Sequence, residues 1–63
     1  MNNPIRFYRE RARMSLESAA LQAGITPEYL AGLERGSERR WTARLAPLAA
    51  LFDVPVSELV AAS

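Results

Sequence analysis

Hydrophobic residues recur along this chain at helical spacing, and polar or glycine residues interrupt them at short intervals. Leu30 and Leu33 lie three positions apart, and between positions 45 and 52 the apolar residues follow an i, i+3, i+4, i+7 stripe. No segment shows the strict alternation of apolar and polar residues that is typical of a half-buried strand. The pattern therefore predicts an all-α fold.

Capping residues divide the chain into five short predicted helices. Each one is too short to be stable alone, so packing between helices must hold them. The first begins after Asn2 or Asn3 with Pro4 in its first position and runs to about Arg13. The second follows Ser15 and ends at Gly24, and the third follows Thr26 and ends at Gly36. The fourth runs from Thr42 or Ala43 to Phe52, with Asp53 as its stop. The fifth covers Val56–Ala61.

The segment from Ser15 to Gly36 contains two helices joined by a very short turn. Alanines at positions 19, 20 and 23 give the first of these helices a face of small side chains, which lets a neighbouring helix approach closely. Only Gly24, Ile25 and Thr26 separate the pair, and glycine tolerates the left-handed backbone that such a turn requires. Residues 15–36 therefore predict a helix-turn-helix unit, in which the second helix enters the major groove of DNA.

Three segments carry a resemblance to a known family. They read A-x-x-x-G-I-T over Ala20–Thr26, L-x-x-L-E-R-G over Leu30–Gly36, and L-F-D-V-P-V-S-E-L over Leu51–Leu59. Together they resemble the phage-repressor-type helix-turn-helix proteins, the Cro/C1 or XRE family, over roughly Ile5 to Val60. The resemblance implies a single domain over residues 1–63 with a lambda-repressor-like fold of five helices. It also implies a transcriptional repressor or regulator that binds double-stranded DNA, usually as a homodimer on two half-sites.

The resemblance further implies which residues face the bases. In the family the start of the third helix and a position one turn later meet base edges, and these positions are Thr26, Pro27, Glu28, Tyr29 and Gly32 here. Pro27 has no amide hydrogen and Gly32 has no side chain. Glu28 can accept a hydrogen bond from a cytosine amino group but repels phosphate. Tyr29 is the best remaining candidate, so we expect weak or relaxed specificity.

Phosphate contacts are implied at the start of the second helix and in the loop after the third. The glutamine common in the family at the start of the second helix is Leu16 here, which donates no hydrogen bond. All eight basic residues are arginine, whose guanidinium suits bidentate phosphate contacts. The alternative for the arginine-rich loop is an ordinary solvated turn. The expected phosphate-contacting residues are Ser15, Ser37, Arg39, Arg40 and Arg44, together with Arg6 and Arg13 near the N-terminus.

Arg9 and Glu34 match a pair that recurs in the family between the first helix and the end of the recognition helix. The resemblance implies a structural role, in which a partly buried ion pair fixes the angle between the two helices. Removing one partner of a deeply buried pair costs about 3–5 kcal/mol. The alternative is a solvent-exposed pair, which contributes less than about 1 kcal/mol.

Composition narrows the remaining classes of function. The chain has no histidine, no cysteine and no lysine, so no usual nucleophile–base pair can be built, and we expect neither catalysis nor a metal or other cofactor. The net charge of +1 favours no partner by itself. No stretch reaches the length of a membrane span, and the start lacks the apolar core of a signal peptide. We therefore expect a soluble, cytoplasmic protein.

A protein-binding helix-turn-helix module is the alternative function. The stretches S-L-E-S-A-A and P-E-Y-L are also similar to the cytoplasmic domain of a bacterial cell-shape membrane protein, which uses this fold to hold cytoskeletal partners. Leu16, Glu28 and Gly32 suit this alternative, whereas the arginine-rich loop and the L-F-D-V-P-V-S-E-L segment suit DNA binding. A DNA-binding protein should gather arginines beside the third helix, and a protein-binding module should place an apolar patch there.

Overall fold

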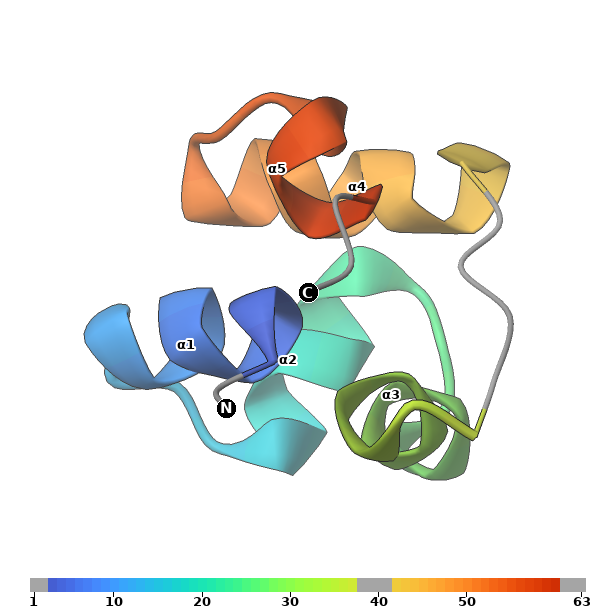
Figure 1. The fold of residues 1–63 in the computed structure, drawn as a ribbon. Coiled ribbons are helices and arrows are strands. Elements are labelled where there is room, and N and C mark those ends of the chain that lie inside the picture. The colour runs from blue at the N-terminus through green and yellow to red at the C-terminus, as the bar shows by residue number, and fades with distance from the viewer. Residues whose placement is uncertain (1–2, 38–41, 61–63) are drawn as a thin grey trace.

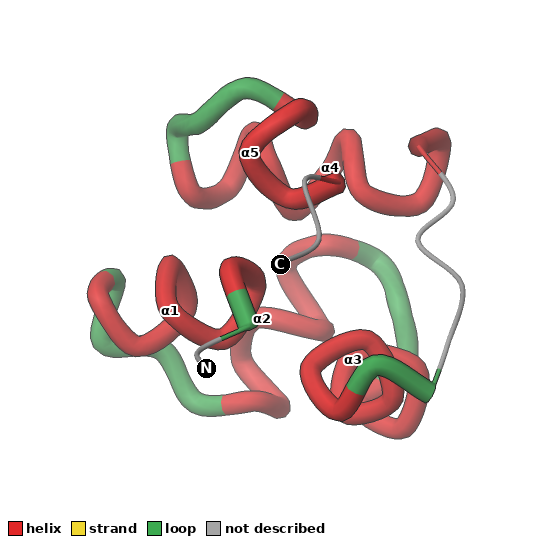
Figure 2. The backbone as a smooth tube through the Cα atoms, viewed as in Figure 1, coloured by secondary structure: helices red, strands yellow, loops and turns green. Residues whose placement is uncertain are grey.

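The described part of the chain, residues 3–37 and 42–60 of a computed structural model, contains five helices and no strand (Figures 1 and 2). This confirms the predicted all-α fold. No helix within this part is long and apolar enough to cross a membrane. The helices are α1 (Pro4–Arg11), α2 (Leu16–Ala23), α3 (Pro27–Arg35), α4 (Thr42–Phe52) and α5 (Val56–Val60).

The first three helices begin at the capping residues that the sequence predicts. The side-chain oxygens of Asn3, Ser15 and Thr26 accept hydrogen bonds from first-turn amides at 2.8, 3.0 and 3.0 Å. These bonds satisfy amides that have no partner within the helix. Of the two asparagines considered for α1, Asn3 is the cap. Proline opens both α1 and α3, where its missing amide hydrogen has no cost.

Four helices end in the same way, with one residue in the left-handed backbone region. These residues are Arg13, Gly24, Gly36 and Asp53, with φ of 59°, 72°, 82° and 58°. After each of them, the next amide donates to a carbonyl five residues earlier at 2.9–3.2 Å, as in a Schellman motif. The predicted stop at Asp53 is confirmed. The predicted end of the first helix at about Arg13 lies two residues too late, because Arg13 forms the turn and α1 ends at Arg11.

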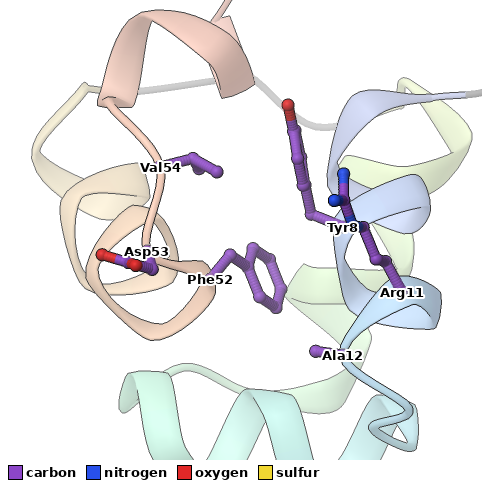
Figure 3. A pocket seen from close by; sticks show the side chains of 6 residues that line it. All are labelled: Tyr8, Arg11, Ala12, Phe52, Asp53 and Val54. Atoms are coloured by element: carbon purple, nitrogen blue, oxygen red, sulfur yellow. The ribbon is translucent and has the colours of Figure 1, made fainter.

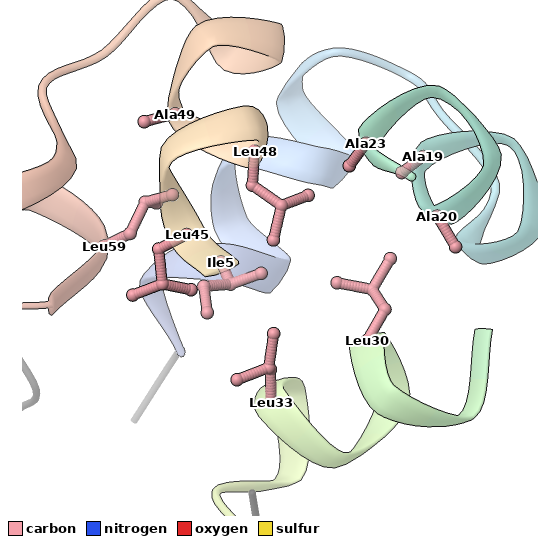
Figure 4. Close-up of a cluster of buried hydrophobic side chains, with 10 residues drawn as sticks. All are labelled: Ile5, Ala19, Ala20, Ala23, Leu30, Leu33, Leu45, Leu48, Ala49 and Leu59. Carbon is pink, nitrogen blue, oxygen red and sulfur yellow. The ribbon is translucent and has the colours of Figure 1, made fainter. Parts of the chain in front are cut away.

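A small hydrophobic core holds the five helices together (Figure 4). The alanine face of α2 is almost fully buried, and α3 and α4 both pack closely against this helix, as its small side chains predict. The leucines of α3 and α4 fill the space between the helices, so each helix buries its apolar stripe. The core consists of Ile5, Ala19, Ala20, Ala23, Leu30, Leu33, Leu45, Leu48, Ala49 and Leu59.

Pro47 lies inside α4, which continues to Phe52 despite it. Proline removes one hydrogen bond of the helix, to the carbonyl four residues earlier at Ala43. Both residues are on the exposed side of α4, where water can take the place of the missing donor. The buried side of the helix, with Leu45 and Leu48, keeps its packing against the core.

Candidate nucleic-acid interface

The turn between α2 and α3 sets the orientation of α3, the recognition helix of the helix-turn-helix unit, on the domain. Gly24 has a φ of 72°, and the amide of Ile25 donates to the Ala20 carbonyl at 3.0 Å, which closes α2 and redirects the chain (Figure 2). Leu30 and Leu33 of α3 are then fully buried, so this face of α3 is held against the core. The opposite face and the first turn of α3 are left toward the surface.

The first turn of α3 carries four of the predicted base-contacting residues. Thr26 and Glu28 are exposed, and Pro27 and Tyr29 are half-buried. Glu28 also lies at the positive end of the helix dipole, so it stabilises α3 whether or not it meets DNA. Gly32 is different, because it is buried. We correct the expectation that Gly32 faces base edges, since a buried backbone position offers no surface to a groove.

Arg44 of α4 lies over the ring of Tyr29 in α3. Its guanidinium carbon is 5.4 Å from the ring centroid, which is within the range of a cation–π interaction. The fold thus brings together two residues with different predicted roles, since Tyr29 is expected at base edges and Arg44 at phosphate. Nothing in the sequence indicates this pairing, because the two residues belong to separate helices.

Arg9 and Glu34 form a bidentate ion pair between α1 and α3. Arg9 Nε lies 2.6 Å from Glu34 Oε2, and Arg9 Nη2 lies 3.1 Å from Glu34 Oε1. The two side chains are only 14% and 10% exposed, so this is a partly buried pair. The hydrogen bonds from Arg9 to Glu34 raise the pKa of Arg9 above its usual value, although burial opposes this. Arg9 Nη1 also donates to the Met14 carbonyl at 2.8 Å, which ties the turn after α1 to the same side chain.

A second polar link joins α1 to α3. The side-chain amide of Asn3 donates from Nδ2 to the carbonyl of Leu33 at 3.0 Å, while its Oδ1 caps α1. One asparagine therefore satisfies the start of α1 and a carbonyl of α3. The sequence predicts the capping role only, because the acceptor lies 30 residues away and leaves no local pattern.

The other predicted phosphate-contacting arginines differ in their surroundings. Arg6 is exposed but already pairs with Glu10, at 2.9 Å between Nε and Oε2. Arg13 is exposed in the turn after α1. Arg39 and Arg40 lie outside the described residues, as does Trp41 beside them.

The two serines of the expected set are both exposed and both act in helix capping. Ser15 Oγ accepts from the Ser18 amide at 3.0 Å. The backbone amide of Ser37 donates to the Gly32 carbonyl at 2.9 Å, and its hydroxyl lies 3.4 Å from the same oxygen. Leu16, which stands where the family places a phosphate-binding glutamine, is half-buried and packs against the core.

A surface hollow of about 400 Å³ lies between the end of α1 and the turn from α4 to α5 (Figure 3). At its side Tyr8 donates a hydrogen bond to Glu58 Oε1 at 2.9 Å, which raises the pKa of Tyr8. No residue of α3 lines this hollow, so it is separate from the first turn of the recognition helix. Its lining consists of Tyr8, Arg11, Ala12, Phe52, Asp53 and Val54.

The groups gathered near the first turn of α3 are suited to recognition. Thr26 offers a hydroxyl, Glu28 a carboxylate, Tyr29 a half-buried ring and Arg44 a guanidinium. Within the described residues, no three carboxylates come close enough together to hold a metal ion. This surface can form hydrogen bonds and charge-assisted contacts with base edges and phosphates.

Comparison with known proteins agrees with this geometry. A helix-turn-helix family model matches residues 5–59, a span that includes α2, α3 and the turn between them. No curated protein and no solved structure matches the chain. The match covers most of the chain and confirms the resemblance carried by the three segments. The chain therefore belongs to the Cro/C1-type helix-turn-helix family, the XRE family of DNA-binding transcription regulators.

Proposed function

We propose that this protein is a transcriptional repressor that binds double-stranded DNA with the first turn of α3 in the major groove. The observation that carries this proposal is the orientation of α3. Leu30 and Leu33 hold one face in the core, while Thr26 and Glu28 remain exposed at the N-terminal end. A helix held in this way can place its first turn against base edges without a change in the fold.

The phosphate contacts come from the elements on either side of α3. Arg44 lies beside the first turn through its contact with Tyr29, and Ser15 lies at the exposed start of α2. Arg39 and Arg40, in the segment between α3 and α4, complete the proposed set. Because phosphate contacts position a protein without reading sequence, these residues supply affinity while the first turn of α3 supplies specificity.

The specificity of a single domain is weak in this proposal. Pro27 donates no hydrogen bond, and the Glu28 carboxylate accepts from a cytosine amino group while repelling nearby phosphates. A homodimer on two half-sites one helical turn apart doubles the contacts and compensates for a poor half-site. The repressor thus relies on two-fold symmetry as well as on its base contacts.

Binding of a protein partner is the second candidate, and one feature favours it. Leu21 on α2 is 82% exposed and is the most exposed large apolar side chain of the described residues. The other large exposed apolar side chains of the described residues are Phe7 and Val60, and none of the three belongs to α3. A protein-binding surface on the recognition helix itself therefore has less support than DNA binding there.

The proposal is tested by titrating the labelled protein with mixed-sequence duplex DNA at about 50 mM and about 200 mM salt. Each neutralised phosphate contributes about 0.9 to the slope of log affinity against log salt. We expect binding with a steep slope that falls in the double variant Arg39→Ala/Arg40→Ala. Arg11→Glu is the matched control, because it changes the net charge by the same amount from the end of α1.

The outcomes separate the two candidates. A loss confined to the double variant supports phosphate contact beside α3, and selection from randomised duplexes then identifies the operator. Equal losses in the double variant and in Arg11→Glu mean that net charge alone drives binding. If no duplex binds even at low salt, direct DNA binding by this chain is rejected and the partner surface around Leu21 becomes the leading candidate.

A further inference from the structure

The contact between Arg44 and Tyr29 links the recognition helix to α4. Arg44 is exposed, whereas Tyr29 is half-buried and packs against the hydrophobic core. The ring is therefore the fixed partner and the long arginine side chain is the one that gains an ordered position. Their 5.4 Å separation places the guanidinium near the ring rather than extended into solvent.

A guanidinium held by an aromatic ring keeps its hydrogen-bonding capacity. The cation–π interaction involves the charge of the guanidinium and the ring face, while the N–H donors point outward in the guanidinium plane. Those donors can form a bidentate contact with a phosphate. Because Tyr29 already orders the arginine, binding loses less side-chain freedom when the phosphate arrives.

Arg44 supplies a positive charge beside a stretch of α3 that has none of its own. Between Pro27 and Glu34 the helix has no basic residue, and Glu28 is an exposed acid in its first turn. Arg44 comes from another helix and brings a positive charge to Tyr29, the residue that follows Glu28.

We propose that Arg44 and Tyr29 act as one unit, in which Arg44 binds a DNA phosphate at the edge of the groove and Tyr29 is the positioning residue that holds it there. This inference rests on the proposed DNA binding by α3. It differs from the separate roles expected from the sequence, because Tyr29 acts through Arg44 and not by reading a base.

A double-mutant cycle in DNA affinity tests the coupling. Arg44→Ala should weaken binding about tenfold, the effect of losing one charge-assisted contact, and should lower the salt slope by about 0.9. Tyr29→Leu, which removes the ring, should weaken binding about threefold through loss of the cation–π contact. In the Arg44→Ala background, Tyr29→Leu should have no further effect. Tyr29→Phe keeps the ring and should bind as the unaltered protein does.

Each outcome has a distinct meaning. If Tyr29→Leu weakens binding equally with and without Arg44, or if Tyr29→Phe is as weak as Tyr29→Leu, then Tyr29 does not act by holding Arg44 against its ring and the inference is wrong. In both cases DNA binding by α3 still stands. If the unaltered protein shows no salt-dependent binding, the proposed function fails and the inference fails with it.

A second measurement does not depend on the folding of the Tyr29→Leu variant. The Nε–Hε signal of Arg44 in a ¹H–¹⁵N NMR spectrum should show a ring-current shift in the free protein. Saturation with duplex DNA should leave that shift in place, since the guanidinium stays near the ring as it binds phosphate. Loss of the shift in the complex would mean that Arg44 leaves Tyr29 to reach DNA, which overturns the proposed unit.

Discussion

Neighbouring residues of α1 join this helix to two different parts of the domain, Tyr8 to α5 and Arg9 to α3. At the α1–α3 junction Arg9 makes a bidentate pair with Glu34 in a site where both side chains are at most 14% exposed. At the α1–α5 junction Tyr8 makes a single exposed hydrogen bond to Glu58. Both junctions end on a glutamate carboxylate, but the buried one pairs it with a charged guanidinium and the exposed one with a neutral hydroxyl.

Burial decides what these contacts contribute. An exposed pair competes with water and is screened by salt, whereas a partly buried pair leaves an uncompensated charge when one partner is removed. The recognition helix is therefore held to α1 by the stronger of the two junctions. This arrangement fits a domain whose function requires α3 to keep one orientation.

The largest effect is expected when the α1–α3 junction is broken. Glu34→Ala leaves Arg9 partly buried without its anion and should destabilise the domain by about 3 kcal/mol, or on the order of 15 °C in Tm. Thermal unfolding followed by circular dichroism measures this. Glu10→Ala is the control, since it removes the exposed partner of Arg6 and should cost less than about 0.5 kcal/mol. Equal effects would mean that burial does not distinguish the pairs.

Replacing both members of the buried pair should restore most of that loss. Arg9→Met/Glu34→Leu removes both charges with side chains of similar size, but it also leaves the Met14 carbonyl without its Arg9 donor. Its stability should therefore lie within about 1.5 kcal/mol of that of the unaltered protein. If the pair also fixes the angle of α3, DNA affinity should fall even though the double variant is stable. Unfolding and DNA titration of the same preparation separate these effects. Full affinity in a stable double variant would limit the pair to a stabilising role.

The turn that follows α1 offers a gain in stability. Arg13 adopts a φ of 59°, a conformation that costs a non-glycine residue about 1 kcal/mol, so Arg13→Gly should stabilise the domain by about that amount. The reverse change, Gly24→Ala, should destabilise it similarly, because an added Cβ meets no atom within 4 Å and only the backbone conformation is strained. Urea unfolding measures both. Loss of stability in Arg13→Gly would indicate that the arginine side chain supports the turn.

The smallest effect is expected at the α1–α5 junction. The hydrogen bond to Glu58 raises the pKa of Tyr8, so its contribution is complete below the unfolded value of 10.0 and is lost as the pH rises through the higher folded value. Between pH of about 9 and about 11, Tm should therefore fall more for the unaltered protein than for Tyr8→Phe. Melting curves across this range provide the measurement. Parallel slopes would show that the bond to Glu58 adds no alkaline sensitivity.

Much of the fold could be predicted because helix signals are local. The side chains of Asn3, Ser15 and Thr26 cap helices through bonds within three residues, and Gly24 and Gly36 end helices by their own backbone preference. The predicted end of the first helix at about Arg13 was wrong because the prediction relied on the same local signals. A residue without the glycine signal occupies a left-handed turn there, and the closing bonds of the turn impose it.

Family resemblance, rather than local pattern, indicated the pairing of Arg9 with Glu34, which the structure shows, and the proposed base contacts at the start of α3. It did not reveal that Gly32 is buried, because burial depends on how neighbouring helices cover α3. It also did not indicate that Arg44 of α4 lies over Tyr29 of α3.

By itself, the sequence determined the approximate extent of the helices, the N-terminal caps of α1 to α3 and the small-residue face of α2, since each depends on residues only a few positions apart. Only the tertiary structure decided which side chains meet across the domain. Arg9 and Glu34 are 25 residues apart, Asn3 and Leu33 are 30 apart, and Tyr8 and Glu58 are 50 apart. Contacts of this kind exist only after the apolar stripes have packed, because the packed core sets the distance and the burial that give each polar contact its strength.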